Sequence, residues 1–391
     1  MIVHNSQNPY YRYPLGAVPT DTTVRLAIDV DIDREISFVK VHTWQENCGA
    51  MYYELKQSSW DKHHYFVDLV MPEDGCLLWY YFVIELADKS LLYYGDNKEQ
   101  LGGIGQESEE MVPSYQITVY RKDAKTPDWF KKSVMYQIFP DRFYRSGNQI
   151  IEKKHAVLHC DWNEEPSYYL DIDTKNIIDY DYFGGNIQGV KEKLPYLKDL
   201  GISVIYFNPI FKSRANHHYD TADYYQVDPM FGTNEEFKDL CETAAKMGIK
   251  IILDGVFSHT GSDSIYFNKY GSFNNLGAYQ SKESPYYEWY DFKEYPSKYD
   301  CWWGFTTMPN IKETTPSYMD FMIRGEDSVL NFWMDKGISG WRLDVIDELP
   351  QKFTRCFYQK LKKINKDAVI IGEVWEDASN KISYDVPREY L

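Results

Sequence analysis

Short hydrophobic runs that alternate with polar residues cover the first part of the chain, residues 1 to 122. Alternation with a period of two is typical of half-buried β-strands, and turn residues such as Pro72–Gly75 separate the runs. Several short strands at this spacing predict an all-β sandwich of immunoglobulin-like type. The predicted strands are Thr23–Val30, Ser37–Thr43, Ala50–Leu55, Tyr65–Leu69, Leu77–Leu86, Leu91–Tyr94 and Tyr115–Tyr120.

The pattern changes at Val134, where fully hydrophobic runs begin to alternate with amphipathic segments. Such strands, separated by helices, predict a parallel sheet that is covered on both faces, in either a doubly wound sheet or a barrel. Gly201, Gly248 and Gly337 each follow an amphipathic segment, as glycines that end helices do. The predicted strands are 134–139, 203–207, 249–254, 338–344 and 368–373, and the predicted helices are 189–200, 234–247, 317–336 and 351–366.

Two domains follow from this change of pattern. Residues 1–122 form the predicted sandwich, and residues 123–391 form the predicted β/α domain, with an excursion after its third strand at about 255–307. The charged, proline-containing stretch Arg121–Trp129 has the composition of a linker between them.

Charged residues occur where several of the predicted parallel strands end. Asp254, Asp344 and Glu373 each close a hydrophobic run, and Arg342 lies two residues before Asp344. A carboxylate at the end of a buried strand costs free energy of folding unless it is paired with a cation, so its presence there calls for an ion pair or a catalytic role. One explanation is a set of structural ion pairs, in which Arg342 neutralises its neighbours. Because three strands share the feature, we favour an active site at the carboxyl ends of the strands.

Two carboxylates on neighbouring strands can lie about 5–5.5 Å apart, the spacing of a retaining glycosidase. One of them then attacks the sugar, while the other is protonated and donates its proton to the leaving oxygen. Arg342 and Asp344 point to the same face of their strand, so we expect Arg342 to lower the pKa of Asp344 and keep it anionic. Asp344 is therefore the predicted nucleophile and Glu373 the predicted general acid.

The predicted site residues lie in stretches of distinctive sequence. Three of these are DGVFSH (254–259), GWRLDVIDE (340–348) and GEVW (372–375), and four others are YQIFPDRF (136–143), FGGNIQGV (183–190), NHHYDTADYYQVDPMFG (216–232) and MPNIKETTPSY (308–318). In order and spacing they resemble the α-amylase superfamily. With the all-β domain before them, they are most similar to its neopullulanase, cyclomaltodextrinase and maltogenic amylase group. The resemblance implies a (β/α)8 TIM-type barrel.

The resemblance also implies roles for individual residues. Asp344 resembles the nucleophile of the family and Glu373 its acid/base, while Arg342 resembles the arginine that holds the nucleophile. Asp254 resembles the carboxylate that orients that arginine, and His259 resembles the histidine that bonds the sugar at the cleavage point. Tyr219 resembles the aromatic platform under that sugar, with His217 and Asp220 next to the tyrosine. Trp375 resembles the aromatic residue on the leaving-group side.

The lesser residues also have plainer explanations. His217 could be a loop histidine without a ligand, Asp220 could pair only within its loop, and Trp375 could be a packing residue. Glu348 either lines the cleft or belongs to the ordinary surface, and we favour the cleft.

Several positions depart from the family pattern. Ser258 stands where many amylases have an asparagine that binds calcium, Asn186 replaces a frequent ligand aspartate, and the loop 144–149 lacks a dense run of ligands. The sequence therefore predicts no required metal or other cofactor, and it supports calcium only weakly. Lys312 replaces the asparagine usual in the neopullulanase group, with no predicted effect on the substrate.

The predicted barrel strands number five, whereas a closed barrel has eight. The third catalytic carboxylate of the family lies on a later strand and has no counterpart before Leu391. We therefore expect an incomplete barrel, an N-terminal fragment of a longer enzyme, and little or no hydrolysis of maltodextrin by this chain alone.

Composition restricts the partners and the compartment. The net charge of −17 argues against a nucleic-acid partner, and the absence of an eighteen-residue hydrophobic run argues against a membrane span. Six cysteines without C-x-x-C spacing, and no visible signal peptide, indicate a reduced, cytoplasmic protein. Aromatic residues make up 17% of the chain, which suits sugar recognition, although core packing accounts for many of them.

The predicted function is a retaining α-glycosidase that hydrolyses, and also transfers, α-1,4-glucosidic links in maltodextrins, cyclodextrins or pullulan. Two alternatives stay open: a non-catalytic, sugar-binding relative, and a branching or isomerising enzyme of the same superfamily. The partner is an α-glucan oligosaccharide. The N-terminal domain is a candidate for glucan binding or for forming a homodimer.

Overall fold

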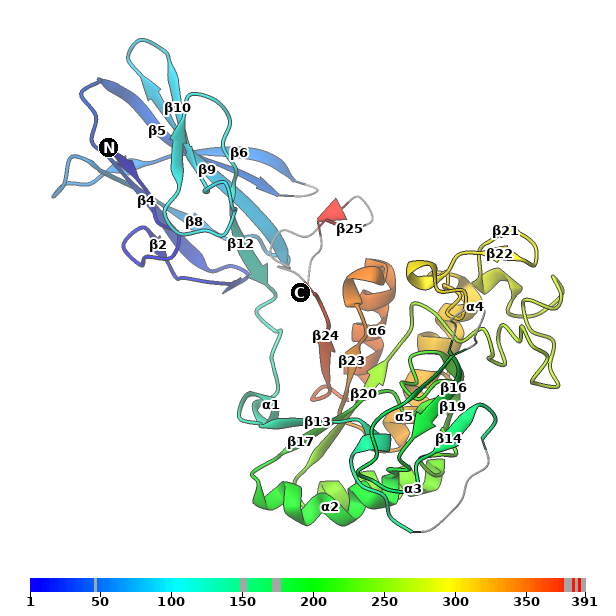
Figure 1. Cartoon of the computed structure of the whole chain (residues 1–391). Helices are drawn as coiled ribbons and strands as arrows, with labels where there is room; N and C mark the ends of the chain where they lie inside the picture. The colour runs from blue at the N-terminus through cyan, green and yellow to red at the C-terminus, as the bar shows by residue number, and fades with distance from the viewer. Residues whose placement is uncertain (46–47, 148–152, 171–176, 376–381, 384–385, 388–391) are drawn as a thin grey trace. The chain divides into compact units, whose positions relative to one another are not determined.

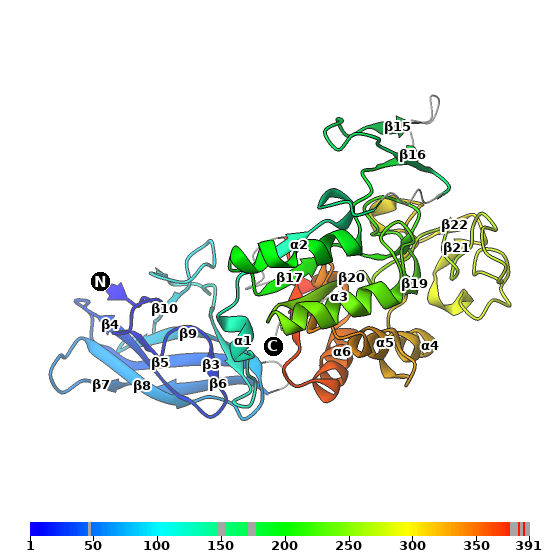
Figure 2. The same cartoon turned by 90° about the horizontal axis from the view of Figure 1, so that it is seen from below.

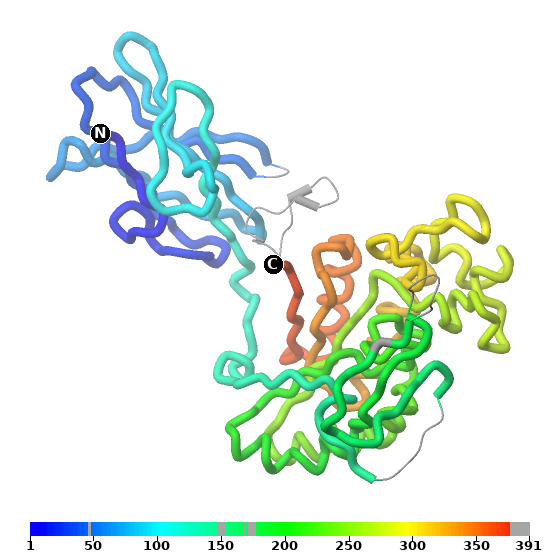
Figure 3. Tube along the Cα trace, in the orientation of Figure 1, coloured from blue at the N-terminus to red at the C-terminus, as the bar shows by residue number. Residues whose placement is uncertain are grey.

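The computed structural model describes residues 1–45, 48–147, 153–170, 177–375, 382–383 and 386–387. The chain divides into two compact units, one of which covers Met1–Lys125 and the other Thr126–Val386. Figure 1 labels the helices and strands of both units, and Figure 3 follows the chain through them.

The first unit consists of two sheets whose strands pair in antiparallel fashion, except for β12 and β3, which pair in parallel. One sheet has the strand order β1-β4-β8-β7 with β2 beside β4, and the other has the order β11-β10-β9-β12-β3 with β5 beside β9 and β6 beside β5. All seven strands expected from the alternating pattern are present, with ends shifted by at most two residues. The strands are β1 (Ile2–Val3), β2 (Arg12–Tyr13), β3 (Val18–Pro19), β4 (Thr23–Val30), β5 (Ile36–Gln45), β6 (Gly49–Glu54), β7 (Lys56–Gln57), β8 (His64–Val70), β9 (Cys76–Leu86), β10 (Leu91–Gly95), β11 (Gln106–Ser108) and β12 (Tyr115–Tyr120).

The core of this unit lies between side chains from both sheets. Leu26 and Ile28 of β4 belong to one buried cluster with Val41 of β5, Phe82 of β9 and Ile117 of β12, and all of them are fully buried. Alternate residues of each strand supply this cluster, as the period of two requires.

The second unit is built on a parallel sheet of five described strands in the order β13-β17-β20-β23-β24. Each expected strand is present; β17 and β20 are almost entirely buried, whereas β13 is buried only at Ile138. Their carboxyl ends lie at the same edge of the sheet. The strands are β13 (Met135–Ile138), β17 (Val204–Phe207), β20 (Lys250–Gly255), β23 (Gly340–Leu343) and β24 (Val369–Gly372).

Helices cover the sheet. Figure 2 shows α2 and α3 side by side over one part of it, and Figure 1 shows α6 beside β23 and β24. Gly201, Gly248 and Gly337 have positive φ angles of 87°, 76° and 99°, which confirms that they follow helix ends. The helices are α1 (Asp128–Lys131), α2 (Ile187–Asp199), α3 (Asn234–Lys246), α4 (Pro316–Met319), α5 (Val329–Asp335) and α6 (Gln351–Ile364), with the shorter helical turns η1 (Pro140–Arg142), η2 (Tyr287–Trp289), η3 (Trp302–Gly304), η4 (Asp320–Arg324) and η5 (Ile346–Glu348).

The helix expected over 317–336 is interrupted. α4 runs into the π-helical turn η4, and α5 starts only at Val329. Gly325 leaves the helical conformation, and the Ser328 side chain caps the new helix by accepting a hydrogen bond from the Asn331 N–H. The hydrophobic period alone did not reveal this break.

Several additions project from the β/α frame. The long segment after β20 contains η2, β21, β22 and η3. Two smaller additions were not expected from the sequence: a three-stranded sheet before α2 and a hairpin before α3. The added strands are β14 (Ala156–Leu158), β15 (Tyr168–Leu170), β16 (Ile177–Tyr182), β18 (Phe211–Ser213), β19 (Thr221–Val227), β21 (Phe292–Glu294) and β22 (Lys298–Tyr299), and near the end of the chain lie β25 (Ile382–Ser383) and β26 (Val386–Pro387).

Candidate active site

Three neighbouring strands bring their terminal carboxylates together. Asp254 lies in β20, Asp344 directly follows β23 and Glu373 directly follows β24. Asp254 is paired in register with Arg342, and Leu343 with Gly372, so the strand ends lie level with one another. We call Asp254, Arg342, Asp344 and Glu373 the strand-end cluster.

Arg342 is the centre of the strand-end cluster. Its Nη1 atom lies 2.8 Å from Asp254 Oδ1 and 2.8 Å from Asp344 Oδ1, while Nη2 lies 2.5 Å from Glu373 Oε1. The arginine side chain is 11% exposed. One guanidinium therefore donates to three carboxylates, which is one more than we expected from the sequence.

Burial controls the ionisation of the strand-end cluster. It raises the pKa of Asp254 to about 6, against the attraction of Arg342. It also raises the pKa of Asp344 to about 7, and the charges of Asp254 and Glu373 add to this effect. Arg342 favours the anion of Asp344, as expected, but it does not prevail. The expected net lowering of the Asp344 pKa is therefore wrong.

A turn of unusual conformation links Asp344 to Glu373. Val345 adopts a left-handed conformation with φ of 38° and ψ of 63°, which is costly for a β-branched residue. In this conformation its backbone N–H donates to Glu373 Oε2 over 3.2 Å. The strained turn thus holds the Glu373 carboxylate next to the residue that follows Asp344.

Two tyrosines extend the cluster toward β17 and the loop before β19. Tyr206 of β17 donates its hydroxyl proton to Asp254 Oδ2 over 2.5 Å, and Tyr219 donates to the same oxygen over 3.2 Å. Both oxygens of the Asp254 carboxylate are therefore satisfied, one by Arg342 and the other by the tyrosines. Asp254 is held in place by its neighbours on both sides.

His259 is buried next to the cluster. Its Nε2 lies 3.1 Å from the Tyr219 carbonyl oxygen and its Nδ1 lies 3.0 Å from Ser258 Oγ. The carbonyl requires a proton on Nε2, so Nδ1 accepts from the serine hydroxyl. Burial lowers the pKa of His259 to about 4, so the ring is neutral. The Trp302 ring lies 5.4 Å from the histidine ring.

His217 and Asp220 bond mainly within their own loop. His217 Nδ1 accepts from the Tyr219 backbone N–H over 3.1 Å, and burial lowers the pKa of this histidine. Asp220 accepts from the Ser213 hydroxyl and from the Ala215 N–H. Both residues shape the loop that carries Tyr219.

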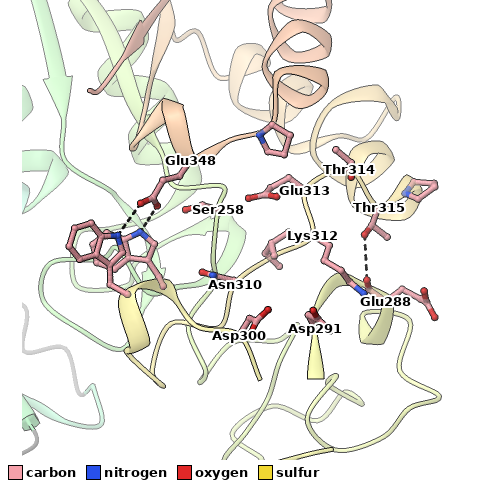
Figure 4. A pocket seen from close by; sticks show the side chains of 15 residues that line it. Ser258, Glu288, Asp291, Asp300, Asn310, Lys312, Glu313, Thr314, Thr315 and Glu348 are labelled. Atoms are coloured by element: carbon pink, nitrogen blue, oxygen red, sulfur yellow. Dashed lines mark hydrogen bonds between the residues drawn. The ribbon is translucent and has the colours of Figure 1, made fainter. Parts of the chain in front are cut away.

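A cavity of about 880 Å³ opens beside His259, between the excursion after β20 and η5 (Figure 4). Glu348 lines it and accepts hydrogen bonds from the indole N–H groups of Trp302 and Trp303, over 2.8 and 2.9 Å. Trp375 is 57% exposed, and its ring lies 5.5 Å from that of Trp303. Glu348, Trp302 and Trp303 thus form one wall of the cavity, the aromatic wall, and Trp375 contacts this wall through Trp303 without itself lining the cavity.

The residues at the positions linked to calcium have protein partners. The Asn186 side chain accepts from the Gly189 N–H and caps α2, and Ser258 bonds His259. Residues 148 and 149 of the loop 144–149 lie outside the described residues. Within the described ranges, no group of three or more His, Cys, Asp or Glu side chains is arranged to hold a metal ion.

Sequence reasoning missed some residues of the site. Tyr206 was counted only as part of a hydrophobic strand, although its place near the end of β17 could have marked it. Trp302 and Trp303 belong to the excursion, where two adjacent tryptophans were the available signal. Glu313, which lines the cavity, has no predicted role, although it lies beside Lys312 in the stretch 308–318.

Comparison with known proteins agrees with this architecture. A family profile described as the alpha-amylase catalytic domain matches residues 137–388. An amylopullulanase from Thermoanaerobacter thermohydrosulfuricus is 39% identical over 96% of this chain and 28% of its own length. Neopullulanase 2 from Thermoactinomyces vulgaris is 32% identical over 80% of this chain and 50% of its own length. The chain thus spans half or less of these relatives.

Solved structures are similar as well. A cyclomaltodextrinase aligns with a TM-score of 0.57 and 25% identity, over 96% of this chain and 61% of that one. A cyclic α-maltosyl-(1→6)-maltose hydrolase from Arthrobacter globiformis aligns with a TM-score of 0.55 and 28% identity, over 65% and 53%. Among the described residues, no helix has the length and hydrophobicity to cross a membrane. The chain belongs to the alpha-amylase family of glycoside hydrolases, which act on O-glycosyl bonds and have a TIM-barrel catalytic domain.

Proposed function

We propose that the chain carries the catalytic residues of a retaining α-glycosidase that cleaves α-1,4-glucosidic links. The proposal rests on one observation above all: Asp344 and Glu373 bond to the two Nη atoms of the same guanidinium, at 2.8 and 2.5 Å. Two carboxylates bound to the two nitrogens of one guanidinium are close neighbours, which supports the short carboxylate spacing of a retaining enzyme over the wider spacing of an inverting one.

In the proposed mechanism, an oxygen of Asp344 bonds to the anomeric carbon while the glycosidic C–O bond breaks. Glu373 gives its proton to the departing oxygen. In the second step a water molecule gives a proton to Glu373, its oxygen bonds to the anomeric carbon, and Asp344 leaves. A sugar hydroxyl in place of water yields transfer instead of hydrolysis.

Neighbouring residues have supporting roles in this proposal. Arg342, held by Asp254, orients Asp344 and stabilises its anion. Tyr219 offers its ring to the sugar at the cleavage point, His217 and Asp220 fix its loop, and His259 borders that sugar. Glu348 and Trp375 contact the glucan through the aromatic wall.

The substrate proposed is a maltodextrin, a cyclodextrin or pullulan. The names of the relatives, which include amylopullulanase, neopullulanase and cyclomaltodextrinase, support this range. The net charge of −17 suits a neutral glucan better than an anionic polymer. We also propose an immunoglobulin-like arrangement and a glucan-binding or dimerising role for the unit Met1–Lys125, and a cytoplasmic location, which the six free cysteines support.

Covalent labelling tests the mechanism. The chain is incubated with 5-fluoro-α-glucosyl fluoride, whose activated leaving group makes labelling less demanding than the hydrolysis of maltodextrin, and its peptides are examined by mass spectrometry. We expect one fluoroglucosyl group on Asp344, complete loss of the label in Asp344→Asn, and retention of it in Asp347→Asn, a matched change three residues away. A label on another carboxylate would contradict the proposal, as would no label at all, which is the result expected of a sugar-binding relative. Product analysis with maltotetraose separates hydrolysis from branching or isomerisation.

A further inference from the structure

The cavity beside His259 contains a carboxyl group that the proposed mechanism does not use. Glu313 lies in the segment before α4, and only 8% of its surface is exposed. It lines the cavity together with Trp302, Trp303 and Glu348. Figure 4 shows its carboxyl group turned toward the side of the cavity where Ser258 lies.

Nothing in the described part of the chain neutralises this acid. Its carboxyl group accepts a hydrogen bond from its own backbone N–H, and no arginine, lysine or histidine of the described residues forms an ion pair with it. The adjacent Lys312 is exposed. Burial, together with the charge of Glu348, raises the pKa of Glu313 to about 8. At neutral pH the group is therefore a carboxylic acid with an O–H to donate.

The surroundings of Glu313 suit a neutral, hydroxyl-rich ligand. Trp302 and Trp303 supply aromatic surface, and Asn310 has a buried side-chain oxygen without a hydrogen-bond partner among the described residues. An anionic ligand would meet an excess of acidic groups. The other charged side chains that line the cavity are Glu288, Asp291, Asp300, Lys312 and Glu348.

We propose that Glu313 is a specificity-determining residue whose carboxyl group donates a hydrogen bond to a hydroxyl of a glucosyl residue bound in this cavity. The inference rests on the proposed function, because it takes the ligand to be an α-glucan. A sugar hydroxyl both donates and accepts, and a neutral acid matches it in both respects, whereas a carboxylate only accepts. An acid that serves only the fold would have no need of a cavity.

Calorimetric titration with maltotriose tests the inference on the 391-residue chain. At pH 6 we expect Glu313→Ala to weaken binding about tenfold, the loss of one hydrogen bond. Glu313→Gln should bind within about threefold of the unchanged protein, because its amide N–H can donate in place of the acid. At pH 9 the unchanged protein should lose affinity while Glu313→Gln retains it. Glu283→Gln, an exposed glutamate that does not line the cavity, is the matched control and should behave as the unchanged protein at both pH values.

Three results would overturn the inference: equal affinity of Glu313→Ala and the unchanged protein at pH 6, a parallel loss of affinity in the unchanged protein and Glu313→Gln at pH 9, or no binding of maltotriose by any of them. If Glu313→Ala does not fold, the affinities of the unchanged protein and Glu313→Gln at pH 6 and pH 9 decide the question by themselves. Failure of the proposed function is seen separately, as the absence of a label on Asp344.

Discussion

Two groups of buried acids lie close together in this protein and are treated in opposite ways. In the strand-end cluster, Asp254, Asp344 and Glu373 surround one guanidinium. In the cavity, Glu348 is held by two indole N–H groups and Glu313 has no cationic partner in the described structure. In the first group a buried cation favours the anions against burial, whereas in the second group Glu313 binds a proton.

The difference shows how the same side chain acquires different chemistry. A carboxylate beside Arg342 can remain an anion and attack, whereas a carboxyl group away from any cation becomes a donor. However, one guanidinium is shared among three acids, so the pKa of Asp344 still rises to about 7. The two groups therefore differ in how strongly a cation opposes the rise in pKa that burial causes. Substitutions that remove a charge can make one group resemble the other.

The largest expected effect comes from removing the shared cation. Arg342→Met leaves the buried Asp254 and Asp344 and the half-buried Glu373 without a counter-charge, and we expect a loss of about 3–5 kcal/mol in the free energy of unfolding at pH 8. The loss should shrink at pH 5, where the acids can take up protons. Urea denaturation measures it. Arg324→Met removes an exposed ion pair with Asp320 and should cost about 1 kcal/mol or less. Equal losses of unfolding free energy in Arg342→Met and Arg324→Met would contradict the proposed dependence of the strand-end cluster on its cation.

A somewhat smaller effect is expected from the acid in the cavity. The folded protein holds the Glu313 proton up to about pH 8, whereas the unfolded chain releases it near pH 4.5, so this residue lowers stability as the pH rises between these values. Relative to the unchanged protein, Glu313→Gln should therefore gain ~2–4 kcal/mol between pH 5 and pH 8. Thermal and urea unfolding at both pH values measure the gain. Glu288→Gln should show no such gain relative to the unchanged protein. If Glu313→Gln also shows no gain between pH 5 and pH 8, Glu313 does not hold a proton in the folded protein over this range.

The next effect concerns the pH dependence of labelling. An ionised Asp344 is needed for attack, so the rate of labelling should rise with pH through about pH 7. Asp254→Asn removes the strongest repelling charge, lowers the pKa of Asp344, and should move this rise about one pH unit toward acid. The labelling rate at a series of pH values measures the shift. Glu283→Gln, an exposed glutamate of the excursion, is the control and should leave the rise where it is. A shift toward alkaline pH would contradict the assignment.

The smallest effect is expected at the aromatic wall. Glu348→Ala removes the acceptor of two indole N–H groups, one of which belongs to a tryptophan that is 67% exposed and can turn to water. We expect a loss of about 1 kcal/mol and a change in tryptophan fluorescence. Glu348→Gln, which keeps an acceptor, should lose less. A loss as large as that of Arg342→Met would contradict the separation of Glu348 from the strand-end cluster.

The strand ends were predictable because their signal is local. A hydrophobic run that closes on Asp254, Asp344 or Glu373 can be read without knowing the rest of the fold, and the geometry of a parallel sheet then brings the ends together. The place of Arg342 beside Asp344 followed from the alternation of side chains along one strand.

Quantities that sum over distant segments were not predictable in this way. The pKa of Asp344 depends on burial and on the charges of Asp254 and Glu373 as well as on Arg342, so judging it from one neighbour gave the wrong sign. Glu313 is a buried acid only in the folded protein, where it lines a cavity together with Trp302 of the excursion. The break after η4 depends on a local cap at Ser328 that competes with the hydrophobic period.

The strained turn at Val345 has a mechanical consequence. The peptide unit that carries its N–H is joined covalently to Asp344 and by a hydrogen bond to Glu373. A rotation of this plane therefore acts on both carboxyl groups, which Arg342 also links, so neither group is positioned independently of the other. The left-handed conformation of Val345 is costly for a β-branched residue, and it holds that plane in its orientation. The strained turn therefore helps to fix the distance between the Asp344 and Glu373 carboxyl groups, where we propose that the sugar binds.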